Sequence, residues 1–341
     1  MRALFIAPSY YPHIGGVEYV VKSISERLVN MGHEVTVLAG ELDLDRPREE
    51  ELNGVRVIRW PTWSPGGAYH FPRRRSELEK FLVEAASKVD VVHVHSVHAL
   101  FTVYSGLIIR EKLRDVKLVI APHYHGGGHT FLRKMLWIPW KSRVSKLLSR
   151  ADTIHAVSKR EASLLSHHYS CVMNKMVVIP NGVDEDVFSY KWLGLDSDYI
   201  VYAGRIEKYK RLELAVDVAK MLRLRLLVIG QGPYRNGLVR YVNKNYKGMA
   251  EFLDHKPREE YLELVSRARY AVNPSKREAY SIFTAEALAM STPAILSREI
   301  AENLETQAKP FVKDLVVVEK APIKTWSEIL LMYIKELYTK A

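Results

Sequence analysis

Two glutamates, Glu278 and Glu286, are the residues of this chain whose types and spacing most directly suggest chemistry. They lie in the segment 273–297, NPSKREAYSIFTAEALAMSTPAILS, which predicts a strand end, a polar turn, a helix over 284–290 and a short apolar strand. Carboxylates accept hydrogen bonds from hydroxyl groups, and a helix start offers free N–H groups to an anion. The segment therefore suits a ligand that carries both hydroxyl groups and phosphate. Taken singly, Glu278 is better explained as a solvated turn residue and Glu286 as an ordinary surface residue.

A glycine pair, Gly15 and Gly16, follows the first predicted strand (3–7) and precedes a helix with apolar residues at helical spacing. In open α/β sheets, ligands bind outside the carboxyl ends of the strands, which is where this pair lies. The pair does not form the Gly-x-Gly-x-x-Gly pattern, so a dinucleotide site is not supported. A tight turn explains the pair at least as well as a ligand does.

Three histidines, His123, His125 and His129, share a glycine-rich loop after the predicted strand 118–121. Their spacing admits a metal site, but no carboxylate or cysteine is interleaved, so we expect no metal here. A histidine beside a bound sugar hydroxyl fits a glycine-rich loop at a strand end better. The alternative is a solvated turn.

Apolar runs separated by helical patterns position these residues and predict an α/β protein with parallel sheets. The predicted strands are 3–7, 35–39, 55–60, 89–95, 118–121, 153–157, 177–179, 199–203, 225–229, 251–253, 270–272 and 294–296. The segment 61–75, rich in Pro, Gly and Arg, predicts a long surface loop. Periodicity is lost over 185–197, so we expect one domain at 1–185 and a second at 196–320. The amphipathic helix at the end of the chain, within 325–341, is expected to pack on the first domain.

Composition limits the class of protein. The 341 residues carry a formal net charge of +11, which favours anionic partners without choosing among phosphorylated ligands, anionic membrane and nucleic acid. Basic strands interleaved with aromatic residues are not evident, so nucleic acid is the least favoured. The single cysteine, Cys171, excludes an internal disulfide and fits a reducing compartment. With no apparent signal peptide, we expect a cytoplasmic protein.

The segment 131–150, FLRKMLWIPWKSRVSKLLSR, contains six basic residues and no acidic one. Its apolar side bears Trp137 and Trp140, and a basic helix with interfacial tryptophans is what binding to an anionic membrane surface requires. Pro139 predicts either one kinked helix or two shorter ones. A core helix with a solvated basic face explains the segment equally well.

The motifs together resemble one family. Glu278 and Glu286, with seven residues between them, lie in REAYSIFTAEALAMSTP, and YAGRIEKYKR precedes them at 202–211. Supporting motifs are HVHS at 93–96, VSKREASLL at 157–165, IPNGVD at 179–184 and GQGP at 230–233. In this order, over nearly the whole chain, they resemble the retaining nucleotide-sugar glycosyltransferases of family four. The resemblance implies the GT-B fold, in which two Rossmann-like, doubly wound domains face a central cleft, the first binding acceptor and the second binding donor.

The resemblance also implies roles for single residues. Arg205 and Lys210 are expected to grip the donor diphosphate and to neutralise the leaving group without a metal or cofactor, and Glu278 to accept from the donor sugar. Glu286 is expected to accept from the ribose. The implied catalytic residues are His123, with His125 as the alternate, Arg205, Lys210 and Glu278. The implied donor-binding residues are Gly15, Gly16, Gly204, Gly232, Ser281, Ile282, Phe283 and Glu286.

This chain departs from the family pattern in the donor half. Ala279 and Ser281 stand where the family usually has glycines, and Ser291 stands where it often has glycine. After Ser297 the chain lacks the Gly-Gly-x-x-Glu segment that often closes the donor pocket. These departures concern the contacts to base and sugar rather than the fold.

The predicted function is transfer of a hexose from a nucleotide diphosphate sugar to a glycan or lipid-linked acceptor, with peripheral membrane contact through 131–150. A nucleotide-sugar epimerase or phosphorylase on the same fold is the alternative, and a non-catalytic basic scaffold is the third hypothesis. Dependence of turnover on an added acceptor discriminates between transfer and the other reactions. The sequence does not identify the sugar, base, acceptor, linkage or oligomeric state.

Overall fold

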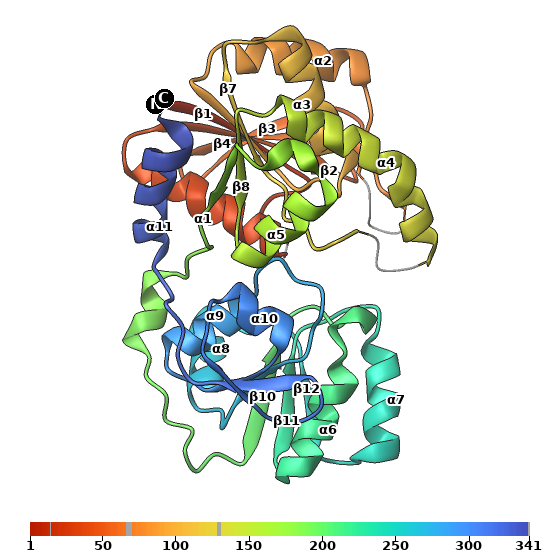
Figure 1. Ribbon diagram of the computed structural model, residues 1–341, viewed down its shortest axis with the longest axis vertical. Helices are drawn as coiled ribbons and strands as arrows, with labels where there is room; N and C mark the ends of the chain where they lie inside the picture. The colour runs from red at the N-terminus through yellow and green to blue at the C-terminus, as the bar shows by residue number, and fades with distance from the viewer. Residues whose placement is uncertain (14, 66–69, 128–130, 340–341) are drawn as a thin grey trace. The chain divides into compact units, whose positions relative to one another are not determined.

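The computed structural model describes residues 1–13, 15–65, 70–127 and 131–339 and divides into two compact units. The first unit comprises Met1–Asn181 and Trp326–Ala341, and the second comprises Gly182–Thr325 (Figure 1). The chain therefore enters the second unit once and returns to the first for its last helix.

The first unit is built on a mainly parallel sheet in the order β3-β4-β2-β1-β6-β7-β8-β9, with β5 paired to β4. Only β3 and β5 run antiparallel to their neighbour, β4. The strands are β1 (Arg2–Ala7), β2 (Glu34–Glu41), β3 (Arg48–Leu52), β4 (Val55–Trp63), β5 (Phe71–Pro72), β6 (Val91–His95), β7 (Lys117–Ala121), β8 (Thr153–Ala156) and β9 (Met176–Val178).

Helices cover both faces of this sheet, which is why its central strands are buried on both faces and mostly apolar. Along β1, Ala3, Phe5 and Ala7 face one core and Leu4 and Ile6 face the other. The first core includes α1 (Gly16–Asn30) and α11 (Trp326–Met332). The second includes α2 (Arg75–Ala86), α3 (Leu100–Lys112), α4 (Phe131–Arg150) and α5 (Lys159–His168).

The last helix belongs to the first unit. α11 continues as a wider π-helical segment over Tyr333–Tyr338 and packs beside α1 (Figure 1). The Nε1 of Trp326 donates to the hydroxyl of Tyr19, on α1, at 3.2 Å. The apolar side of this helix therefore completes a face of the sheet that lies far from it in sequence.

The prediction of a long loop over 61–75 is wrong. β4 continues through Pro61 and Thr62, which are buried, and α2 begins at Arg75. Pro61 lies near the end of β4, beyond Arg59, where the pairing of β4 with β3 ends, and proline is tolerated at such positions. Residues 66–69 of this segment lie outside the described residues.

One further difference concerns a helix. α3 has no counterpart among the predicted helices, because it packs between α2 and α4 and is apolar on more than one side. Of the two alternatives predicted for 131–150, the structure has the single helix, α4, with Pro139 inside it.

The second unit has a sheet in the order β12-β11-β10-β13-β14-β16-β15. Its strands are β10 (Tyr199–Ala203), β11 (Arg225–Ile229), β12 (Ala250–Leu253), β13 (Ala271–Asn273), β14 (Ala294–Ser297), β15 (Ala308–Pro310) and β16 (Leu315–Val318). The first five are parallel, while β16 runs antiparallel to β14 and β15 antiparallel to β16. The helices are α6 (Leu212–Leu222), α7 (Arg235–Asn245), α8 (Arg258–Ser266), α9 (Ile282–Ala289) and α10 (Arg298–Asn303).

Candidate active site

The loops that follow β10 and β11 pack backbone against backbone in the second unit. The amide of Gly204 donates to the carbonyl of Ile229 at 3.0 Å, and the amide of Ile206 donates to the carbonyl of Gln231 at 2.8 Å. A Cβ at Gly232 would collide with the backbone of Ile206, so this position requires glycine. Gly204 and Gly232 therefore bring the two loops together at the carboxyl edge of the sheet.

Lys210 and Glu278 form an ion pair in the second unit. The Nζ of Lys210 lies 2.7 Å from Oε1 of Glu278, and the two side chains are only 14% and 10% exposed. Although burial alone would lower it, the adjacent carboxylate raises the pKa of Lys210 above its ordinary value. Arg205, by contrast, is 65% exposed and pairs with Glu207 at 3.0 Å. Lys210 is thus a fixed cation and Arg205 a more accessible one.

Asn273, at the end of β13, connects Glu278 to the start of α9. Its Nδ2 lies 2.9 Å from Oγ of Ser281 and 3.4 Å from Oε1 of Glu278. Ser281 caps α9 by accepting from the amide of Thr284. The amides of Ile282 and Phe283 have no partner among the residues that the structure describes. A carboxylate, a lysine and two helix-terminal N–H groups are therefore gathered at one end of this sheet.

Glu286 is buried, with only 3% of its surface exposed, so it is not the ordinary surface residue of the alternative interpretation. Its two oxygens accept from Nη1 of Arg258 and from the hydroxyl of Tyr261, both on α8. Burial raises the pKa of Glu286, and the Arg258 guanidinium opposes this. Arg258 also pairs with Asp186, at 3.0 Å. Arg258 and Tyr261 are not among the predicted site residues, because no local sequence pattern relates α8 to α9.

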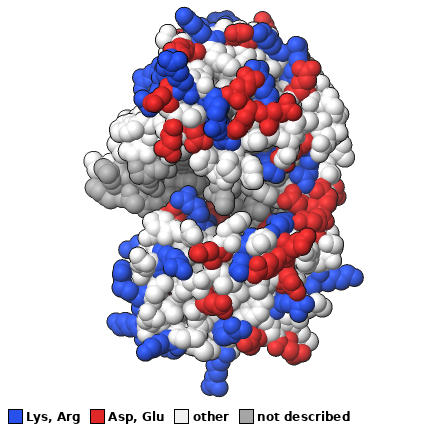
Figure 2. All heavy atoms as spheres, turned by 180° about the vertical axis from the view of Figure 1, so that it is seen from behind, with Lys and Arg blue, Asp and Glu red and all other residues white. Residues whose placement is uncertain are grey.

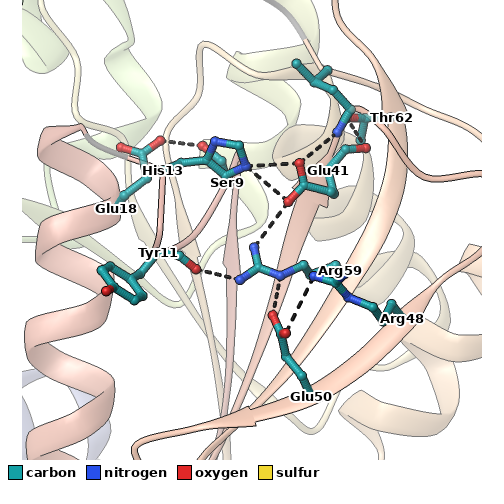
Figure 3. A network of polar contacts seen from close by, with 10 residues as sticks. Ser9, Tyr11, His13, Glu18, Glu41, Arg48, Glu50, Arg59 and Thr62 are labelled. Carbon is teal, nitrogen blue, oxygen red and sulfur yellow. Dashed lines mark hydrogen bonds and ion pairs between the residues drawn. The ribbon is translucent and has the colours of Figure 1, made fainter.

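In the first unit, a polar network fixes the loop between β1 and α1 (Figure 3). Arg59, on β4 and 1% exposed, donates to the backbone carbonyl of Tyr11 and to the carboxylates of Glu41 and Glu50. Nε2 of His13 lies 3.0 Å from both oxygens of Glu41. The charged side chains of three strands thereby hold the loop that leads to the glycine pair.

The two glycines of that loop differ. A Cβ at Gly15 would collide with the carboxylate of Glu18, which also contacts the hydroxyl of Ser9. A Cβ at Gly16, the first residue of α1, would meet nothing within 4 Å. Gly15 is therefore explained by packing within the loop, whereas Gly16 leaves open space.

His123 follows β7 with a left-handed backbone, φ +48°, and its ring lies against that of His95, at the end of β6. Nε2 of His123 is 3.1 Å from Nδ1 of His95. His125 instead stacks on His98, with ring centroids 4.1 Å apart. His123 and His125 therefore have different environments, and His129 lies outside the described residues.

Comparison with known proteins identifies the family. The sequence model of Glycosyltransferase Family 4 matches residues 14–187, and that of Glycosyl transferases group 1 matches residues 190–335. The chain belongs to glycosyltransferase family 4. Among relatives of this glycosyltransferase, it is 23% identical over 289 residues to an uncharacterized glycosyltransferase of Methanocaldococcus jannaschii, covering 85% of this chain and 77% of that protein. It is 26% identical over 326 residues to the glycogen synthase of Mycobacterium tuberculosis, covering 87% and 78%.

Solved structures show the same fold. The sucrose-phosphate synthase of Thermosynechococcus elongatus superposes with a TM-score of 0.70 at 19% identity, covering 88% of this chain and 82% of that one. Anabaena HepE in complex with UDP-glucose superposes with a TM-score of 0.66 at 13% identity, covering 98% and 90%. The glycosyltransferase therefore has the predicted GT-B fold of two Rossmann-like domains.

Proposed function

We propose that this glycosyltransferase transfers a hexose, with retention of configuration, from a nucleotide diphosphate sugar to a glycan or lipid-linked acceptor. The observation that carries the donor part is the Lys210–Glu278 pair, joined through Asn273 to the start of α9. Cation, carboxylate and free helix-terminal amides are the groups that a sugar diphosphate requires.

Each group has a proposed role. Lys210 and Arg205 neutralise the charge that develops on the leaving nucleoside diphosphate, so the reaction needs no metal ion. The amides of Ile282 and Phe283 bind the distal phosphate, and Glu278 accepts from the sugar hydroxyls. Glu286 accepts from the ribose with the lone pairs that Arg258 and Tyr261 leave free, since a carboxylate has about four acceptor positions.

The named relatives support a nucleotide sugar as donor. HepE was solved in complex with UDP-glucose. None of these proteins identifies the base or the sugar for this chain, because the identities lie between 13% and 26%.

The donor is tested by thermal unfolding with UDP, GDP, ADP and their sugar conjugates in the absence of divalent metal. A ligand that binds only the folded state raises the Tm by mass action. We expect a rise with one nucleotide family, and product analysis by NMR should then show the anomeric configuration of the donor. Absence of any rise would contradict the donor assignment, and inversion at the anomeric carbon would contradict retention.

Three alternatives are distinguished by the co-substrate that turnover requires. An epimerase would consume nucleotide sugar without any acceptor, and a phosphorylase would require phosphate. A basic scaffold would show neither reaction. Figure 2 shows that Lys and Arg are interspersed with Asp and Glu on the visible face of each unit, rather than gathered as a nucleic-acid surface would need.

We also propose that α4 contacts an anionic membrane. Its apolar residues Met135, Leu136 and Ile138 are 55%, 48% and 73% exposed. Exposed basic residues follow on the same helix: Lys141, Arg143, Lys146 and Arg150. The contact that we propose is peripheral. No described helix is long and apolar enough to cross a membrane.

The expected role of the tryptophans in this contact is wrong. Nε1 of Trp140 donates to the carbonyl of Val97 at 3.0 Å, and the ring of Trp137 lies against Tyr124 with centroids 5.9 Å apart. Both side chains therefore anchor α4 to the first unit, and the proposed membrane contact depends on the three exposed aliphatic residues.

Vesicle cosedimentation tests the membrane contact. Wild-type protein should sediment with phosphatidylglycerol vesicles more than with phosphatidylcholine vesicles, and an M135D/I138D variant should lose this difference. Met221→Asp on α6, at a position that is 50% exposed, is the matched control and should sediment like wild type. Equal binding to both vesicles would contradict the proposal.

A further inference from the structure

We infer that His95 is a positioning residue that fixes the tautomer of His123, so that His123 presents its Nδ1–H to the substrate. The inference rests on the proposed function in one respect, the role at the donor sugar that the family resemblance implies for His123. The tautomer itself follows from the histidine geometry alone.

The two rings share a single proton position. Nδ1 of His95 and Nε2 of His123 are 3.1 Å apart, so one of these nitrogens donates and the other accepts. Burial holds the pKa of His95 well below its ordinary value and lowers that of His123 to about 3, so both imidazoles are neutral. A neutral imidazole carries one N–H, and the choice of donor therefore determines where both protons lie.

The surroundings of Nε2 of His95 decide which of the two histidines donates the hydrogen bond. Nε2 of His95 is buried without a hydrogen-bond partner among the described residues, and the residue is 0% exposed. If His123 donated, the proton of His95 would be on this nitrogen as a buried N–H with no acceptor, which proteins rarely tolerate. If His95 donates, its Nε2 carries no proton and His123 carries its proton on Nδ1. The second arrangement is favoured.

The backbone of His123 is held as firmly as its ring. The next residue, Tyr124, donates its amide to the buried carboxyl of Glu161, whose other oxygen accepts from the amide of Val157 at 2.7 Å. Glu161 is 1% exposed and belongs to α5. These bonds fix the left-handed turn at His123 from one side, while His95 fixes the ring from the other.

The tautomer of His123 determines which hydrogen bond this residue can make to the substrate. With Nε2 of His123 accepting from His95, its remaining nitrogen has no partner among the described residues and carries the proton. His123 then donates a hydrogen bond to an oxygen of the substrate, either a sugar hydroxyl or a phosphate oxygen. It does not act as a general base, because its Nε2 already accepts from His95 and its Nδ1 carries a proton.

Long-range proton–nitrogen NMR of the ¹⁵N-labelled enzyme tests the tautomer directly. The spectrum distinguishes a protonated ring nitrogen from an unprotonated one, and His123→Asn assigns the signals of His123 by difference. We expect protonated Nδ1 and unprotonated Nε2. A protonated Nε2 in His123 would overturn the inference, whatever the activity.

Substitution of His95 tests the positioning role. His95→Leu should change the tautomer signals of His123 and lower kcat about tenfold or more, with a smaller change in the KM for donor. His95→Asn can place an amide N–H near the position of Nδ1–H and should recover most of kcat. The control His33→Asn, at a histidine that contacts the amino terminus, should match wild type. An unchanged kcat in a folded His95→Leu variant would contradict the positioning role.

The two proposals fail in different ways. If the expected tautomer is found but no nucleotide sugar is turned over, the proposed function fails and the tautomer stands. If transfer occurs but Nε2 of His123 is protonated, the inference about the tautomer fails and the proposed function stands.

Discussion

At the scale of single residues, the charged groups of the second unit are held in pairs. Lys210 pairs with Glu278, and Arg258 pairs with both Glu286 and Asp186. A nucleotide-sugar donor that binds to Lys210 and Glu278 must contact both members of an existing ion pair. Such a pair keeps both side chains oriented before the substrate binds, which lowers the cost of reorganisation.

Lys210→Ala should reduce kcat of transfer about 10²- to 10³-fold, because one preorganised cation at the developing diphosphate charge is lost. Lys208→Ala, an exposed lysine on the same short helix, is the control and should retain activity. Initial-rate kinetics with saturating donor measure the effect. Comparable activity in the two variants would contradict the role of Lys210.

Arg258→Met should destabilise the second unit by about 1–3 kcal/mol, because the buried carboxylate of Glu286 loses its charged partner. The double variant R258M/E286L should recover part of this loss, since the two residues are coupled. Urea unfolding measures both effects. Strictly additive losses would show that the pair is not coupled.

At the scale of elements, the glycines position whole loops. Gly232 allows the loop after β11 to touch the loop after β10, and Gly15 leaves room for Glu18. Gly16 has no such neighbour within 4 Å, so packing does not require glycine at this position. Glycines therefore occupy similar turns for different physical reasons.

Gly232→Ala should lower the Tm, because its Cβ would collide with the backbone of Ile206 rather than with a flexible side chain. Gly16→Ala should leave the Tm unchanged, since the added methyl group meets nothing within 4 Å, and should raise the KM for donor. Calorimetry and initial rates measure the two effects. A destabilised Gly16→Ala variant would contradict this division of roles.

At the scale of the whole molecule, three buried histidines lie on strands of the first unit's sheet, and a fourth, His123, follows β7. His93, His95 and His155 are 0% exposed and His123 is 9% exposed. Burial lowers the pKa of all four, to about 4 for His155 and about 3 for His123. The folded first unit therefore excludes protons that the unfolded chain would bind.

The free energy of unfolding of the first unit should fall as the pH is lowered from the ordinary histidine pKa, about 6.5, towards 4. In this range the unfolded chain binds more protons than the folded one, so acid favours unfolding. Glu161 opposes the trend, because burial raises its pKa to about 7 and the folded state binds its proton first. Since the four imidazoles outnumber this one carboxyl group, the free energy of unfolding still falls as the pH is lowered.

Calorimetry between pH 7.5 and pH 5 checks this prediction, and a His155→Phe variant that folds should show a weaker dependence. A Tm that is constant or rises on acidification would contradict it. The measurement also reports on the sheet that carries His95 and His123, independently of any ligand.

The sequence by itself determined the fold class and the family. Parallel strands buried on both faces appear as apolar runs, and the turns after them are marked by glycine and polar residues. Both signals are local, so they are readable without coordinates. The motifs around Glu278, Glu286 and Arg205 are local signals of the same kind, because each is a run of neighbouring residues in the sequence.

Only the tertiary structure decided which side chains meet. Arg258 contacts Glu286 across 28 positions, and His95 contacts His123 across 28 positions. The inward direction of Trp137 and Trp140 and the extension of β4 through Pro61 likewise depend on neighbours from other elements. Periodicity reports how a segment divides between apolar and polar faces, whereas the partner of a buried charge is set by the packing of elements distant in sequence.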